Sequence, residues 1–190
     1  MTEDFERNVN KSSGKNSGFK VLMLASLRPY KGIYEFLKLA NRIPEANFLL
    51  ILSDGSEEVS KFQEENSIPE NLKIFSVQKD VHSFYKSSSL VINLAHKDKV
   101  VETFGLTILE GMYYGLPAIV PTCGGITELV DPGINGFQID YTRLDLIEVE
   151  IKKMMSNKNY WEKLSQEALS KKDCFSRNAF KSQILQLLDK

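Results

Sequence analysis

Glu102-Thr103-Phe104-Gly105-Leu106-Thr107-Ile108-Leu109-Glu110 lies between two apolar runs, Leu90-Val91-Ile92-Asn93-Leu94 and Ala118-Ile119-Val120. Short continuous apolar runs of this kind are typical of strands in a parallel sheet that is covered on both faces. Gly115-Leu116-Pro117 ends the helix that is predicted between them. A strand–loop–helix–strand unit exposes backbone N–H groups where the helix begins, and these groups can bind an anion.

The rest of the chain continues this alternation of strands and helices. Strands are predicted at residues 19–26, 48–52, 72–77 and 137–139, and helices at residues 33–40, 57–65, 82–86 and 126–130. The fold class is therefore α/β. We expect a Rossmann-like, doubly wound parallel sheet of about six strands, with residues 19–26 central and residues 90–94 away from an exposed edge.

The length of 190 residues suits one domain, and 42% hydrophobic with 26% charged residues is ordinary for a globular protein. Residues 1–18 are polar and are expected to form a flexible tail or an interdomain linker. Residues 19–190 are expected to form one nucleotide-binding domain of Rossmann type, with C-terminal helices from about residue 143.

Charge and cysteine content exclude several classes. A net charge of −1, from 24 basic and 25 acidic residues, gives no reason to expect a nucleic-acid partner. Two cysteines make no disulfide framework, and no apolar run approaches the roughly 20 residues that span a bilayer. The N-terminus lacks a signal-peptide pattern. These features predict a cytoplasmic protein and leave open a peripheral position at the inner face of the membrane.

The start of the helix after Glu102 is the first candidate ligand site. Thr103 could cap this helix and leave three N–H groups free, those of Gly105, Leu106 and Thr107. Gly105 has no Cβ, so a phosphate could approach the backbone closely. The alternative is that Glu102 only favours the helix dipole and that Glu110 is solvated.

Two other loops follow strands. Arg28 and Lys31, directly after the first strand, could neutralise a pyrophosphate, or could be ordinary cations of an exposed loop. Cys123-Gly124-Gly125 could let the backbone approach a ligand, or could form a tight turn. No metal site is expected, because His82 and His96 are isolated and the cysteines lack ligand spacing. No GxGxxG follows the first strand, so a dinucleotide cofactor is disfavoured.

Taken together and in this order, the motifs resemble the C-terminal half of a GT-B glycosyltransferase of the retaining family 4 type. The resemblance runs from about Val21 to Phe180. Its most specific part is E-x7-E, here Glu102 to Glu110. It is followed by Gly115-Leu116-Pro117, by Gly124-Gly125-Ile126-Thr127-Glu128-Leu129-Val130 and by Asn135-Gly136-Phe137.

The resemblance implies that this half binds a nucleotide-sugar donor, a UDP-, GDP- or ADP-sugar, with no cofactor and no metal. It implies that Glu102 contacts the transferred sugar and is the catalytic residue, and that Glu110 hydrogen-bonds the ribose. It implies that Lys31 binds the diphosphate with the amides of Gly105, Leu106 and Thr107. The sequence also departs from the family: Ser26 stands where its usual arginine lies, so Arg28 is the expected substitute.

The glycine-rich turn after the second strand appears as Ser53-Asp54-Gly55, and residues 95–101 are longer and more charged than expected. The resemblance also implies an N-terminal acceptor-binding domain, which is not expected within these 190 residues. The leading expectation is therefore a glycosyltransferase half that is inactive alone and that transfers sugar to a glycan or lipid-linked acceptor with its partner domain or subunit. A non-catalytic nucleotide-sugar sensor, half of a sugar-nucleotide epimerase and an interaction domain without a ligand remain alternatives.

Overall fold

The computed structural model describes residues 18–176, 179, 181–182 and 184–185. The tail or linker expected at residues 1–18 lies outside these residues, apart from Gly18. The predicted helical region after residue 143 is described up to residue 176 and in part beyond it.

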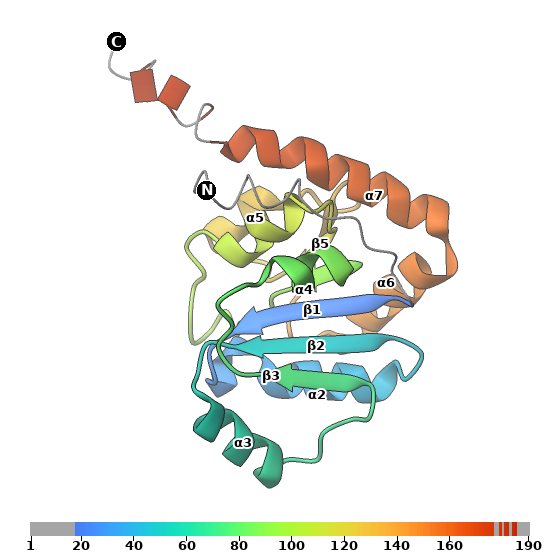
Figure 1. Ribbon diagram of the computed structural model, residues 1–190. Coiled ribbons are helices and arrows are strands. Elements are labelled where there is room, and N and C mark those ends of the chain that lie inside the picture. The colour runs from blue at the N-terminus through green and yellow to red at the C-terminus, as the bar shows by residue number, and fades with distance from the viewer. Residues whose placement is uncertain (1–17, 177–178, 180, 183, 186–190) are drawn as a thin grey trace.

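Within the described residues, six strands form one parallel sheet, in the order β3-β2-β1-β4-β5-β6 (Figure 1). The strands are β1 (Lys20–Ala25), β2 (Asn47–Leu52), β3 (Leu72–Phe75), β4 (Leu90–Ile92), β5 (Ala118–Val120) and β6 (Gly136–Gln138). The predicted α/β class, the number of strands and the central position of the first strand are confirmed. The strand at 90–94 is interior, as expected.

Helices cover both faces of the sheet. They are α2 (Ile33–Arg42), α3 (Ser56–Glu65), α4 (His82–Ser87), α5 (Leu106–Met112), α6 (Leu144–Ser156) and α7 (Lys158–Lys171). The described residues also form three short 3-10 helices, η1 (Pro29–Lys31), η2 (Gly125–Leu129) and η3 (Lys172–Phe175). In the part of the chain that the structure describes, no helix is both long and apolar enough to cross a membrane.

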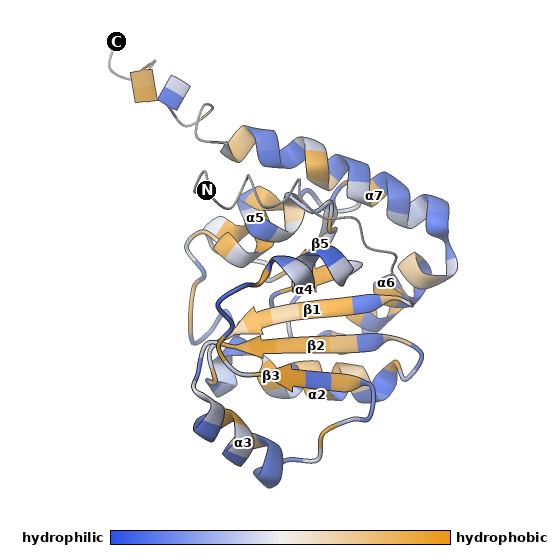
Figure 2. Cartoon of the chain, viewed as in Figure 1, coloured by the Kyte–Doolittle hydropathy of each residue, from blue (hydrophilic) through white to orange (hydrophobic). Residues whose placement is uncertain are grey.

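The central parts of β1 and β2 and the whole of β4 and β5 are apolar because each face of the sheet meets a separate core, whereas polar residues such as Lys20, Asn47 and Lys73 occupy strand starts and the edge strand β3 (Figure 2). In β1, Met23 packs with α2 and α6 on one face, whereas Leu22 packs with α4 and α5 on the other. Phe36 of α2 and Phe48 of β2 meet edge to face, 5.2 Å between ring centroids. A continuous apolar run is thus what a strand buried on both sides requires.

The observed elements differ from the predicted ones mainly at the carboxyl ends of strands. The strand predicted at 72–77 ends at Phe75, and the one predicted at 90–94 ends at Ile92. Beyond these points the backbone bonds elsewhere: the N–H of Val77 donates to the carbonyl of Asp54, and the N–H of Ala95 donates to Asn93 Oδ1. The chain therefore leaves the sheet where it begins to surround the site.

The strand order reverses between β1 and β4. From β1 the chain continues to β2 on one side, and from β4 it continues to β5 on the other. The loops that follow β1 and β4 therefore diverge and leave a crevice at the carboxyl edge of the sheet, where open α/β folds bind ligands.

Candidate functional site

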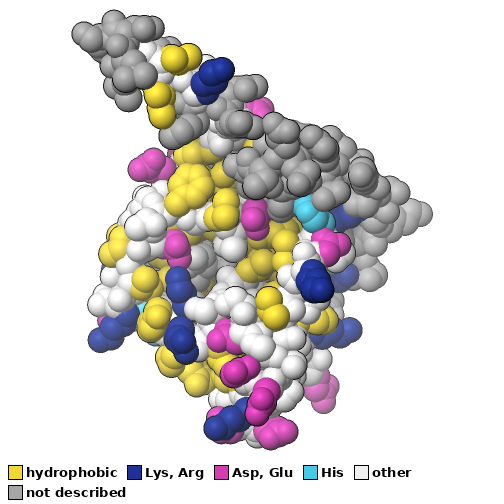
Figure 3. Space-filling model, turned by 60° about the vertical axis from the view of Figure 1, so that its left-hand side comes forward, with side chains coloured by type: hydrophobic (Ala, Val, Ile, Leu, Met, Phe, Trp, Pro, Cys, Tyr) yellow, Lys and Arg dark blue, Asp and Glu magenta, His cyan; other side chains and the backbone are white. Residues whose placement is uncertain are grey.

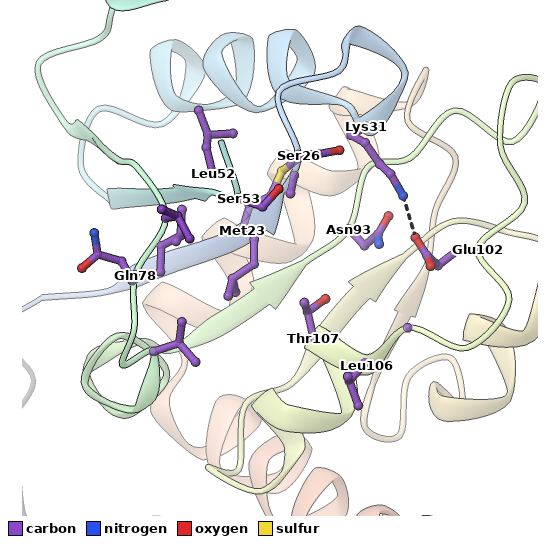
Figure 4. A pocket seen from close by; sticks show the side chains of 16 residues that line it. Met23, Ser26, Lys31, Leu52, Ser53, Gln78, Asn93, Glu102, Leu106 and Thr107 are labelled. Carbon is purple, nitrogen blue, oxygen red and sulfur yellow. Dashed lines mark hydrogen bonds and ion pairs between the residues drawn. The ribbon is translucent and has the colours of Figure 1, made fainter. Parts of the chain in front are cut away.

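A pocket of about 420 Å³ opens at this crevice. Its lining comes from the ends of β1, β2 and β4, from the loop after β3 and from the start of α5 (Figure 4). On the same side of the molecule, hydrophobic side chains lie among acidic and basic ones (Figure 3). A volume of this size is in the range of small-molecule sites.

Lys31 and Glu102 form an ion pair at the pocket, with Lys31 Nζ 3.1 Å from Glu102 Oε2 (Figure 4). Each side chain is 25% exposed. The loop before α5 is tied to η1, because the N–H of His96 donates to the carbonyl of Tyr30. This link brings together two residues that are 71 positions apart. Both were predicted as site residues, but their pairing was not.

The start of α5 differs from the prediction. Gly105, with φ of +82°, is the N-cap residue, and no side chain caps the helix, so the expected cap by Thr103 is wrong. The backbone before α5 is held instead by the start of η2, because the N–H of Ile126 donates to the carbonyl of Glu102. The two segments pack so closely that a Cβ on Gly125 would lie 1.9 Å from the carbonyl oxygen of Thr103. Gly105, Leu106 and Thr107 line the pocket.

Glu110 lies one helical turn beyond Thr107 and is half-buried, and unlike Thr107 it is not among the residues that line the pocket. Its Oε2 accepts a hydrogen bond of 2.7 Å from the hydroxyl of Tyr85. Burial raises the pKa of Glu110, and the hydrogen bond from Tyr85 opposes that change. The alternative of a freely solvated helix residue therefore does not describe Glu110.

Arg28 is not brought to the pocket. It lies instead on a second hollow of about 290 Å³ between η1, α2 and α3, with Tyr34 and Phe62 among its neighbours. The turn of η1 directs Lys31 to one side and leaves Arg28, its N-cap residue, on the other. The expected role of Arg28 as a second phosphate cation stays a prediction that this geometry does not favour, and Ser26 lines the main pocket.

The glycines after β5 serve packing. A Cβ on Gly124 would lie 2.4 Å from the carbonyl oxygen of Glu102, so this turn closely supports the loop that carries Glu102. Cys123 is half-buried with a free thiol, and it does not line the main pocket. Of the two alternatives for Cys123-Gly124-Gly125, the structure shows the tight turn.

Sequence reasoning missed several polar residues of the pocket, namely Ser53, Gln78 and Asn93. A signal was present for Ser53, because it directly follows the predicted strand at 48–52, and such positions face the crevice in an open parallel sheet. Asn93 was placed inside the predicted strand at 90–94, and it reaches the crevice because β4 ends at Ile92. Asp54 supports the same edge, since its Oδ2 accepts a 2.6 Å hydrogen bond from the N–H of Leu27.

The charged segment at residues 95–101 is fastened to its surroundings. His96 stacks on Tyr141 with 3.8 Å between ring centroids, and its Nε2 lies 3.1 Å from Glu35 Oε2. Lys97 pairs with Asp140 and, with Thr142, lowers the pKa of Asp140 to about 2. Among the described residues, no group of three His, Cys, Asp or Glu side chains is placed to hold a metal ion.

A family model and one group of curated relatives match this chain. The family model described as "Glycosyl transferases group 1" matches residues 4–171. Sucrose synthase 2 of Arabidopsis thaliana is 24% identical over 174 residues, which cover 80% of this chain and 22% of that protein.

Solved structures share the fold. HepE from Anabaena, in complex with UDP and glucose, superposes on 100% of this chain and 53% of its own, with a TM-score of 0.77 at 19% identity. A HepE complex with UDP-glucose matches with a TM-score of 0.75. The C-terminal domain of LpcC, a glycosyl transferase group 1 family protein from Francisella tularensis, matches 90% of this chain and 91% of its own, with a TM-score of 0.66 at 18% identity. The chain thus spans about half the length of HepE and less than a quarter of the sucrose synthase.

Proposed function

Because the chain belongs to the glycosyl transferases group 1 family, we propose that it forms the donor-binding half of a retaining glycosyltransferase of the family 4 type. The full protein would transfer a hexose from a nucleoside diphosphate to a glycan or lipid-linked acceptor. The observation that carries the proposal is the convergence of Lys31, Glu102 and the first residues of α5 on one pocket at the point where the strand order reverses.

The chemistry of the pocket suits such a donor. The diphosphate gains negative charge as the sugar leaves, so Lys31 and the amides of Gly105, Leu106 and Thr107 would stabilise the transition state more than the ground state. Glu102 would contact the sugar and Glu110 the ribose. The proposal assigns charge neutralisation to these groups and includes no metal or other cofactor. The HepE complexes with UDP and UDP-glucose favour a UDP-sugar over a GDP- or ADP-sugar.

The other half of the cleft would come from a separate acceptor-binding domain or subunit. Two observations support this division. The chain matches only 53% of HepE, but it matches 91% of a structure that consists of the C-terminal domain of LpcC alone. We propose that residues 19–190 are a single donor domain, and that the 190-residue chain transfers no sugar by itself. A defined glycan product from the purified chain alone would contradict this division.

Titration by NMR or calorimetry with UDP, GDP and ADP, and with their sugars, tests the proposal. We expect saturable but weak binding, with a Kd as high as about 1 mM, because the contacts of the other domain are absent. Shifts should map to residues that line the pocket. Absence of binding by every nucleotide would contradict the proposal. Binding without transfer, even with the acceptor domain supplied, would favour a sensor. Conversion of the donor sugar into its epimer would favour an epimerase.

Replacing Glu102 by Gln is expected to change the affinity of the two ligand types in opposite directions. Lys31 is paired with Glu102 in the free protein, so a diphosphate must compete with this carboxylate. Glu102→Gln should tighten binding of the bare nucleoside diphosphate by up to about fivefold, the scale of a partly exposed ion pair. It should weaken binding of the sugar-bearing donor. Titration of both ligands against both proteins measures this.

The matched control is Glu128→Gln, because Glu128 is exposed and its replacement removes the same charge. Equal tightening in the control would mean that net charge alone is responsible. Weaker binding of the bare nucleotide by Glu102→Gln would show that the ion pair does not compete with phosphate.

Restoring an arginine at position 26 is expected to strengthen phosphate binding. Ser26 lines the pocket and is half-buried (Figure 4). A guanidinium there could contact the diphosphate with two N–H groups, so Ser26→Arg should tighten nucleoside diphosphate binding by roughly tenfold or more. Ser26→Gln, of similar length but without charge, is the control. Unchanged affinity in Ser26→Arg would place the diphosphate away from the end of β1.

A further inference from the structure

The carboxylate of Glu110 accepts a hydrogen bond from a buried phenol. Tyr85, on α4, has no exposed surface, and its hydroxyl donates to Glu110 Oε2 at 2.7 Å. The same hydroxyl lies 3.1 Å from the carbonyl oxygen of Thr107, which belongs to the pocket wall. Tyr85 therefore connects the carboxylate with the first turn of α5.

The ring of Tyr85 is itself fixed in place. It stacks on Tyr114, with 5.7 Å between centroids and 9° between ring planes. The hydroxyl of Tyr114 is hydrogen-bonded to His82 Nδ1. Since α4 and the end of α5 both hold these rings, the hydroxyl of Tyr85 has little freedom to leave Glu110.

The charge states agree with this arrangement. Burial and the nearby Glu110 raise the pKa of Tyr85 well above its ordinary value, so its hydroxyl keeps its proton. Burial raises the pKa of Glu110, and the donated hydrogen bond stabilises its ionised form. Glu110 Oε2 is thus engaged, whereas Oε1 has no hydrogen-bond partner within the described residues.

We propose that Tyr85 is the positioning residue for ribose recognition: it fixes Oε2 of Glu110 and so orients Oε1 to accept hydrogen bonds from the ribose hydroxyls of the donor. This inference rests on the proposed function. It places the ribose specificity of the site in a pair of residues, of which only Glu110 touches the ligand.

The test compares nucleoside diphosphates with ribose and with 2′- or 3′-deoxyribose. The parent protein is expected to prefer ribose by about tenfold, the scale of a hydrogen bond to a charged group. Tyr85→Phe should lose most of this preference by weakening only the ribose form. Glu110→Gln should also lose it, and adding Tyr85→Phe to Glu110→Gln should change nothing further, because Tyr85 acts through Glu110.

The chain offers a matched control for the loss of a tyrosine hydroxyl. Tyr160 donates to Glu150 Oε2 at 3.1 Å, between α7 and α6 and outside the pocket lining. Tyr160→Phe removes a bond of the same kind and should leave the ribose preference unchanged. If Tyr85→Phe weakens ribose and deoxyribose forms equally, Tyr85 has only a structural role and the inference fails.

The pH dependence gives a second readout. Binding of ribose needs ionised Glu110, so the preference should disappear as the pH falls through the raised pKa of Glu110. Tyr85 and His82 of α4 lower this pKa, and Tyr114 lies beside them. Tyr85→Phe removes one stabilising donor, so the carboxyl group of Glu110, followed by ¹³C NMR, should titrate at a higher pH than in the parent. An unmoved midpoint would contradict the inference.

Should Tyr85→Phe fold poorly, the parent protein still provides a test. With ¹³C-labelled tyrosine, the ribose form should shift the resonance of Tyr85, whereas the deoxyribose form should not; equal shifts would overturn the inference. Binding of nucleotides with an unchanged ribose preference in Tyr85→Phe would overturn the inference alone. Failure of the parent to bind any nucleotide would overturn the proposed function and this inference with it.

Discussion

Lys31→Ala is expected to weaken binding of a nucleoside diphosphate by about 10- to 100-fold. A hydrogen bond to a charged group contributes about 1.5–3 kcal/mol, and Lys31 is the side-chain cation among the described residues that line the pocket. The remaining affinity should also depend less on salt, because fewer charges are in contact. Titration at two salt concentrations measures both effects.

Two further variants decide how Lys31 acts. Lys61→Ala removes an exposed lysine of α3, and it should leave affinity and salt dependence unchanged. Lys31→Ala also leaves Glu102 without its partner, and the freed carboxylate would repel phosphate. The double variant Lys31→Ala, Glu102→Gln should therefore recover part of the lost affinity. Parent-like binding by Lys31→Ala would mean that the phosphate site is wrongly assigned, even though the fold is right.

Gly105→Ala is expected to reduce the free energy of unfolding by about 3 kcal/mol. Two costs add here. A left-handed backbone costs a residue with a Cβ about 1–2 kcal/mol, and Gly105 has φ of +82°. The new Cβ would also lie 2.4 Å from Ile126 Cγ1, in a core where overpacking costs about 1–3 kcal/mol. Urea unfolding monitored by circular dichroism measures the sum.

Gly133→Ala separates the two costs. Gly133 has a similar φ of +78°, but a Cβ there would meet no atom within 4 Å. Its replacement should cost only the backbone part, about 1–2 kcal/mol. Equal losses in both variants would show that Ile126 yields without strain. Gly105→Ala should in addition weaken nucleotide binding where it remains folded, because its Cβ would displace the first turn of α5.

The elements of the fold could be predicted from local patterns. Continuous apolar runs such as residues 48–52 form strands because both faces of the sheet are covered, and the spacing of Ile33, Phe36, Leu37 and Ala40 gives α2 its buried face. These signals extend over a few residues, so they do not depend on distant parts of the chain. The ends of the strands were predicted less accurately. They depend on hydrogen bonds made by the loops, such as that from the N–H of Val77 to the carbonyl of Asp54.

The structure brings together some of the predicted site residues and not others. Lys31, Glu102 and the first residues of α5 do meet at one pocket, as the order of strands requires. The cap by Thr103 was wrong, because the turn at Gly124 and Gly125 holds the preceding backbone. Arg28 is close to Lys31 in sequence and was therefore predicted to share its site. The turn of η1 between them directs the two side chains to different pockets.

The sequence alone determined the α/β fold and its order of elements, because hydrophobic periodicity is a local property. Only the tertiary structure decided the partners of the charged groups. Lys31 and Glu102 are 71 residues apart and Tyr85 and Glu110 are 25 apart, and no local pattern specifies either pair. Pairing across such separations depends on how helices and loops pack on the sheet, and this packing fixes distances to within the few tenths of an ångström that a hydrogen bond requires.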